Sequence, residues 1–147
     1  MTDEDFIRAL ESCRLPESDF GHAAHVRAGY LYLQQTDFAG ALARIGRAIR
    51  NYARHLGKPD RYHETITVAY VALIQQHIRE RGDGGGWTAF ARANSELFQP
   101  GLLRHFYPKA QLESDLARTV FLLPRSVTEI AGAANESRDI VVQQLER

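Results

Sequence analysis

The sequence predicts an all-α protein, an antiparallel helical bundle of about five to seven helices. Apolar residues recur at three- and four-residue steps along most of the chain, no segment alternates in the manner of a strand, and no repeat of 20 to 50 residues is evident. A chain of 147 residues with 44% hydrophobic and 24% charged residues has the size and balance of one folded domain. We therefore expect a single helical domain over residues 1–147, with its core at about 15–124.

The first two helices are expected on either side of Pro16. Apolar residues between positions 6 and 10 mark a short helix that ends before this proline, because the residue preceding a proline disfavours the helical region. Ser18 or Asp19 can cap a second helix, which runs to about Gln35.

The third and fourth helices have the clearest apolar stripes. One covers positions 38–56 and stops at Gly57, and the next begins at Asp60 and ends at Arg81. The short turns between the second, third and fourth helices force antiparallel neighbours. The N-terminal ends of the second and fourth helices should therefore lie at the same end of the bundle.

Shorter helices are expected beyond the glycine-rich connection 83–86. A fifth helix covers 87–97, a short apolar turn follows at 102–107, and a sixth helix covers 111–122. The capping pattern that begins at Ser126 opens a helical tail, 126–147, which could dock on the body of the protein or support a homodimer.

Charge and hydropathy disfavour several classes of partner. Eighteen Lys and Arg balance eighteen Asp and Glu, so no global positive charge draws the protein to nucleic acid or to anionic lipid. The N-terminus is acidic and no apolar run reaches the length of a membrane span, so the cytoplasm is the expected location. The single cysteine cannot form an internal disulfide.

Three histidines and a glutamate fall at the shared end of the second and fourth helices. His22 and His25 are three residues apart and neighbour each other on a helix, while His63 and Glu64 begin the fourth helix. Imidazole and carboxylate ligands suit a transition metal such as zinc, iron, copper or nickel. His22, His25, His63 and Glu64 are therefore predicted metal ligands, in a metal-dependent enzyme of hydrolase or oxygenase type.

Two other interpretations stay open. In a metal-free active site a histidine would act as base, with Glu64, Arg27 and Tyr62 as further catalytic residues around a small-molecule substrate. In the alternative, the histidines only cap helices or bond to carbonyls, and the chain is a non-enzymatic module for binding or dimerisation. A deep polar pocket over His22 and His63 would favour the enzyme, and histidines tied to carbonyls would favour the module.

Two basic groups lie outside this motif. A strip of arginines on the third helix could bind phosphate, although a solvated helix face is the expected interpretation. The strip comprises Arg44, Arg47, Arg50 and Arg54. Arg104 and His105 could supply polar groups over the end of the bundle, although a packed connector is the expected interpretation.

The segments Phe20-Gly-His-Ala-Ala-His-Val-Arg, Tyr62-His-Glu-Thr-Ile-Thr and Leu102-Leu-Arg-His-Phe-Tyr together resemble a family of small, uncharacterised bacterial helical proteins. The resemblance covers about positions 15–124 and implies no particular activity. A more distant resemblance is to the HD-type metal-dependent phosphohydrolases, which are also helical. It would make His63-Glu64 the counterpart of their His-Asp pair and Asp115 the late acid.

Overall fold

The protein is all-α, as predicted, in a computed structural model that describes residues 1–125. The expected tail, 126–147, lies outside the described residues. Within residues 1–125 no strand occurs, and seven α-helices follow one another: α1 (Asp3–Glu11), α2 (His22–Gln35), α3 (Phe38–His55), α4 (Glu64–Arg81), α5 (Trp87–Ala93), α6 (Lys109–Leu112) and α7 (Asp115–Thr119).

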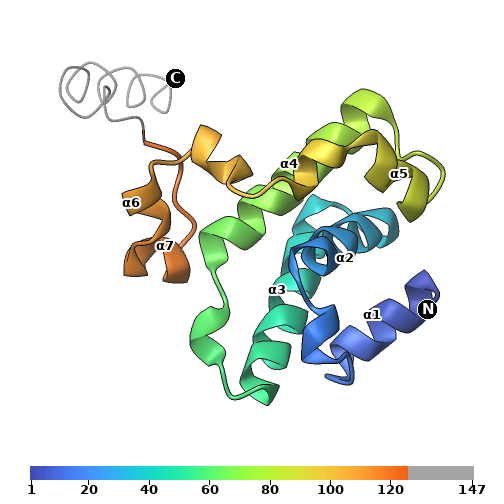
Figure 1. The fold of residues 1–147 in the computed structure, drawn as a ribbon, viewed down its shortest axis with the longest axis horizontal. Helices are drawn as coiled ribbons and strands as arrows, with labels where there is room; N and C mark the ends of the chain where they lie inside the picture. Colours follow the sequence, from blue (N-terminus) through green and yellow to red (C-terminus); the bar gives the residue numbers. More distant parts are fainter. Residues whose placement is uncertain (126–147) are drawn as a thin grey trace, which may run out of the picture.

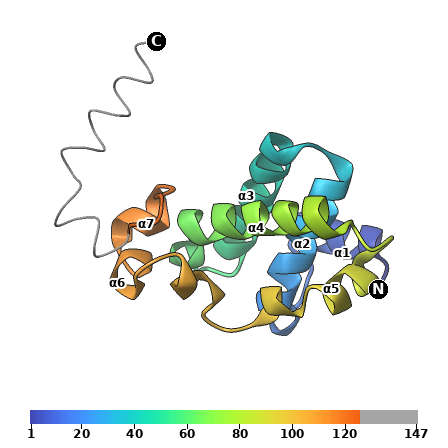
Figure 2. The ribbon, with the colours of Figure 1, turned by 90° about the horizontal axis from the view of Figure 1, so that it is seen from above.

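Helix α4 runs diagonally across the molecule, with α1, α2 and α3 on one side of it (Figure 1). Helices α2 and α3 pack on α4 and on each other, and α1 packs on both of them. Helix α5 lies beside the C-terminal end of α4, whereas α6 and α7 lie beside the N-terminal end of α4. Figure 2 shows this arrangement from above. Within residues 1–125 no helix is long and apolar enough to cross a membrane.

A glycine lets the three long helices approach closely. A Cβ atom on Gly29 of α2 would lie 2.7 Å from Cδ1 of Ile74 on α4 and 3.9 Å from Cδ1 of Ile45 on α3. Ile74 is fully buried and Ile45 is buried at this meeting point. The core therefore depends on the absence of a side chain at position 29.

The predicted starts of the second and fourth helices were wrong. Glu17–Asp19 forms a separate 3-10 turn, and Phe20 (φ −106°, ψ 63°) leaves the helical region, so α2 begins at His22 after Gly21. Pro59–Arg61 is another 3-10 turn, and the extended backbone that follows it delays the start of α4 to Glu64. In both cases a separate turn comes first, so each helix begins later than predicted. Helix α2 therefore begins at His22, and α4 begins at Glu64 with His63 as its N-cap.

Two predicted helices of the second half are broken. The fifth helix ends at Ala93, since Asn94 (φ −126°, ψ 48°) interrupts it, and a 3-10 turn continues over Ser95–Phe98. The sixth is divided into α6 and α7 by Ser114, whose hydroxyl accepts a hydrogen bond from the Ala117 amide (3.1 Å) and caps α7. Short helices with a turn between them replace one continuous segment.

Candidate ligand cavity

The first turns of α2 and α4 lie close together, as the antiparallel arrangement predicts, and border a mainly apolar cavity of about 310 Å³. Helix α3 supplies the remaining wall with Ile45 and Ile49. Ten residues line this apolar cavity: Phe20, Gly21, His22, His25, Ile45, Ile49, Ile66, Thr67, Tyr70 and Val71. Its size is at the lower end of the range usual for small-molecule sites.

His25 is held in one tautomer at the wall of the apolar cavity. Its Nδ1 donates a hydrogen bond to the carbonyl oxygen of Gly21 (2.9 Å), and its ring packs on Phe20 with 4.3 Å between ring centroids. Because Nδ1 carries the hydrogen, Nε2 keeps the lone pair. Burial lowers the pKa of His25 and thus favours the neutral ring. His25 can accept a hydrogen bond or a proton through Nε2.

His22 ties the beginning of α2 to a distant segment. Its Nε2 donates to the carbonyl oxygen of Leu97 (2.9 Å), in the 3-10 turn after α5. The ring meets Tyr70 of α4 edge to face, with 4.8 Å between centroids. Burial raises the pKa of Tyr70, so its hydroxyl stays protonated and remains a hydrogen-bond donor.

A second cavity, of about 360 Å³, adjoins the apolar cavity and shares His22, Ile66 and Tyr70 with it. His63 also lines this second cavity, together with residues of the chain between 101 and 118. Several of these are charged: Arg104, Lys109, Glu113 and Arg118. The two cavities differ in character, since one is mainly apolar and the other carries mostly positive charge.

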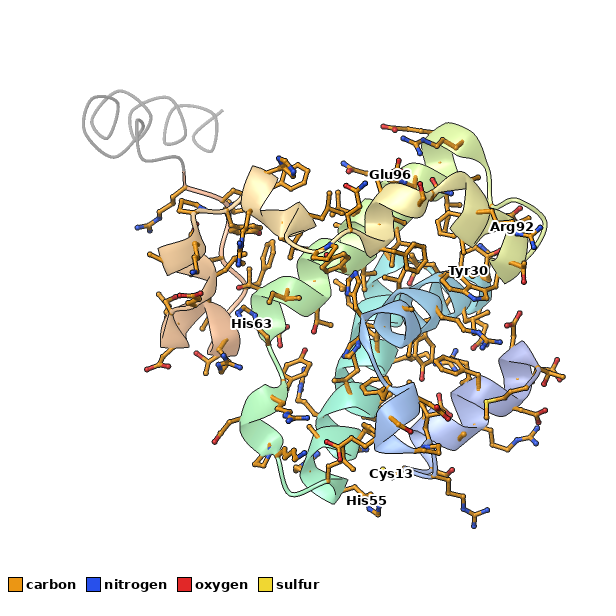
Figure 3. The ribbon with its side chains drawn as sticks, viewed as in Figure 1. Cys13, Tyr30, His55, His63, Arg92 and Glu96 are labelled. Carbon is orange, nitrogen blue, oxygen red and sulfur yellow. The ribbon has the colours of Figure 1, made fainter. Side chains whose placement is uncertain are left out.

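His63 uses both ring nitrogens within the protein. Its Nδ1 accepts the Ile66 amide hydrogen (3.1 Å), which makes it the N-cap of α4, and its Nε2 donates to the carbonyl oxygen of Leu112 (2.7 Å). The side chain is buried at the junction of α4 with α6 (Figure 3). This bonding leaves no lone pair on His63 for a metal ion.

Glu64 lies in a different pocket, and Tyr62 lines both that pocket and a cavity of about 260 Å³ that it shares with His25. The Tyr62 hydroxyl donates to Glu64 Oε2 (2.9 Å), and Arg50 stacks over the Tyr62 ring at 4.8 Å and pairs with Glu64 at 3.6 Å. These three residues line a cavity of about 420 Å³ that has no wall residue in common with the apolar cavity. Burial is the main reason why the pKa of Tyr62 is raised.

Arg27 does not belong to the site. Its Nη2 donates to Asp3 Oδ1 of α1 (2.7 Å), and its guanidinium lies 4.6 Å from the centre of the Phe6 ring. The predicted catalytic role of Arg27 therefore lacks support from its position.

The four predicted metal ligands do not fit one shared ion as they are arranged. The three histidines each bond to a different backbone carbonyl, and Glu64 is bound to Tyr62 and Arg50. In the part of the chain that the structure describes, no group of three or more His, Cys, Asp or Glu residues could hold a metal ion. Metal binding itself stays a prediction.

Sequence reasoning missed several residues of the two cavities. The sequence pattern predicted no role in the site for Tyr70, Lys109 or Arg118, all of which line the second cavity. The one useful signal was Arg104, for which a polar role over the end of the bundle was the less favoured interpretation and which does line the second cavity.

Comparison of the chain with protein-family models, with curated proteins and with solved structures gave no match. The resemblances to a bacterial helical family and to HD-type phosphohydrolases therefore stay predictions.

Proposed function

We propose that this protein is a non-enzymatic binding protein for a small, mainly apolar organic molecule, which occupies the apolar cavity between α2, α3 and α4. The observation that carries the proposal is the cavity of about 310 Å³ whose walls are mostly apolar side chains. Removing apolar ligand surface from water at such walls favours binding by roughly 25 cal/mol per Å² before the cost of immobilising the ligand.

The polar groups at the wall suit recognition of a ligand. Neutral His25 offers a hydrogen-bond acceptor in Nε2, because its Nδ1 is held by Gly21. The protonated Tyr70 hydroxyl offers a donor. A few polar groups in a mainly apolar cavity are typical of ligand sites, where they orient the bound molecule.

The same contacts favour binding over catalysis. All three histidines of the motif bond to backbone carbonyls, which was the arrangement expected of a non-enzymatic module. Of the predicted catalytic residues, Glu64 lies in another pocket and Arg27 is paired with Asp3. Tyr62 shares a cavity with His25 but is bound to Glu64. No serine, cysteine or lysine nucleophile is among the residues that line the apolar cavity.

The test uses neutral probes, 4-phenyl-1-butanol and 2-naphthol, in NMR titrations of the full-length protein. We expect saturable shifts at amides of the cavity walls, with dissociation constants of about 10 µM to 1 mM for ligands of this size. Ile66→Trp should fill the space and weaken binding at least tenfold. Gln76→Trp, at an exposed position of the same helix, is the matched control and should bind normally.

Absence of saturable binding by both probes would refute the proposal. Equal affinity of the Ile66→Trp and Gln76→Trp variants would also refute it, because the probes would then occupy some other surface. Circular dichroism of both variants establishes that each is folded.

A further inference from the structure

The second cavity has a positive wall next to the apolar cavity. The residues that line the second cavity include three cations, Arg104, Lys109 and Arg118, and one carboxylate, that of Glu113. We propose that this wall binds the acidic head group of the ligand whose apolar body occupies the apolar cavity. The ligand class is then a small amphipathic organic acid with a single negative charge. This inference rests on the proposed function and specifies its ligand.

The positive charge of this wall is only weakly compensated. Lys109 Nζ lies 3.8 Å from Glu113 Oε1, but both side chains are about two-thirds exposed (64% and 65%), so water and salt screen the pair. Arg118 donates from Nη1 to the backbone carbonyl oxygen of Asp60 (2.7 Å), which fixes the guanidinium without neutralising it. A guanidinium held in this way can still pair with a carboxylate.

The two cavities meet at a surface suited to a ligand with two unlike ends. His22, Ile66 and Tyr70 line both of them, and the His22 and Tyr70 rings are in contact. A molecule that lies across this ring pair places its apolar part against Ile45 and Ile49 and its acid group beside the cations. Tyr70 lines both cavities, and its protonated hydroxyl can donate a hydrogen bond to the acid.

The pocket around Arg50 is a less suitable anion site. Arg50 already pairs with Glu64 (3.6 Å) and stacks on Tyr62, so part of its charge is compensated. That pocket also has no wall residue in common with the apolar cavity. An acid bound there would gain nothing from the apolar walls.

The experiment compares 4-phenylbutyrate with 4-phenyl-1-butanol, which has the same carbon skeleton and no charge, by isothermal titration calorimetry of the full-length protein. At low salt the acid should bind at least tenfold more tightly than the alcohol, and added NaCl should reduce this ratio. Arg104→Gln and Lys109→Gln should each weaken the acid about three- to tenfold and leave the alcohol unchanged.

Arg92→Gln is the matched control. Arg92 is an exposed arginine of α5, on the opposite side of the molecule from α6 (Figure 3). The Arg92→Gln variant should retain the full preference for the acid.

Each failure has a separate meaning. If the alcohol binds in the apolar cavity and the acid binds no more tightly, the head-group inference is overturned and the proposed function stands. If Arg92→Gln weakens the acid as much as Arg104→Gln does, the preference is a general charge effect and the inference is again overturned. If neither compound binds, the proposed function fails as well.

Discussion

His63 should stabilise the fold through two hydrogen bonds, and its replacement tests whether it is a structural residue or a metal ligand. In His63→Ala the Ile66 amide loses its cap, which costs about 1 kcal/mol. The Leu112 carbonyl loses its donor, which costs about another 1 kcal/mol. With the loss of packing around a side chain that is only 9% exposed, the free energy of unfolding should fall by about 2–3 kcal/mol.

Urea unfolding followed by circular dichroism measures this loss, and thermal unfolding should show a fall in Tm of about 10 °C for a domain of this size. His63→Asn separates the two bonds. Asparagine is a good N-cap but is too short to reach Leu112, so this variant should lose about 1 kcal/mol. His55→Ala, at an exposed histidine at the end of α3, should change stability by less than about 0.5 kcal/mol.

The reasoning about His63 would be refuted if His63→Ala unfolded at the same urea concentration as the unmodified protein. Equal destabilisation by Asn and Ala would refute the capping role alone. Mass spectrometry for bound metals, applied to the same samples, tests the other interpretation. Stoichiometric metal that is lost in a fully stable His63→Ala variant would make His63 a ligand.

Three further predictions concern other contacts. Because burial lowers the pKa of His25, the unfolded chain takes up a proton at a higher pH than the folded protein does. The free energy of unfolding, measured with urea, should therefore fall as the pH drops below about 6.5, and His25→Gln should reduce this pH dependence. Gly29→Ala should lower the free energy of unfolding in urea by about 1–3 kcal/mol. The loss should be smaller in the presence of Ile74→Val, which removes the methyl group 2.7 Å from the new Cβ, and additive losses would contradict the clash. Thr65→Val should lower the free energy of unfolding by about 2 kcal/mol and speed proteolysis at residues 115–123, whereas Thr65→Ser should do neither. If Thr65→Val resisted proteolysis as well as the unmodified protein, the role of the Thr65 hydroxyl would be contradicted.

Local signals predicted the best-defined helices. Helix α3 begins and ends close to the expected residues because its apolar stripe is continuous and Asp37 caps it by accepting the Gly40 amide hydrogen (2.8 Å). The start of α2 was misplaced because Ser18 and Asp19 are also good residues for a short turn. Capping residues indicate that a turn of helix can begin, but they do not say whether it continues.

The site was only partly predictable. The sequence placed His22 and His25 beside the start of α4, and the structure agrees. Arg27 follows His25 by two residues, or about 200° around a helix, so it faces away, and this could have been seen from the sequence. The partners of the histidines could not be seen, because the carbonyls of Leu97 and Leu112 come from segments 75 and 49 residues away.

Hydrogen bonds from α2 and α4 to distant backbone segments help to explain why a cavity persists at this end of the protein. His22 bonds to the segment after α5, and His63 bonds to α6. Fully buried Thr65 holds the chain after α7 through Val120 and Leu122. These bonds fix the helix starts from outside, whereas Gly29 and Ile74 hold the centre of α2 and α4 together. Helices held at both places need no large side chain between their first turns, and the space that remains is the one in which we place the ligand.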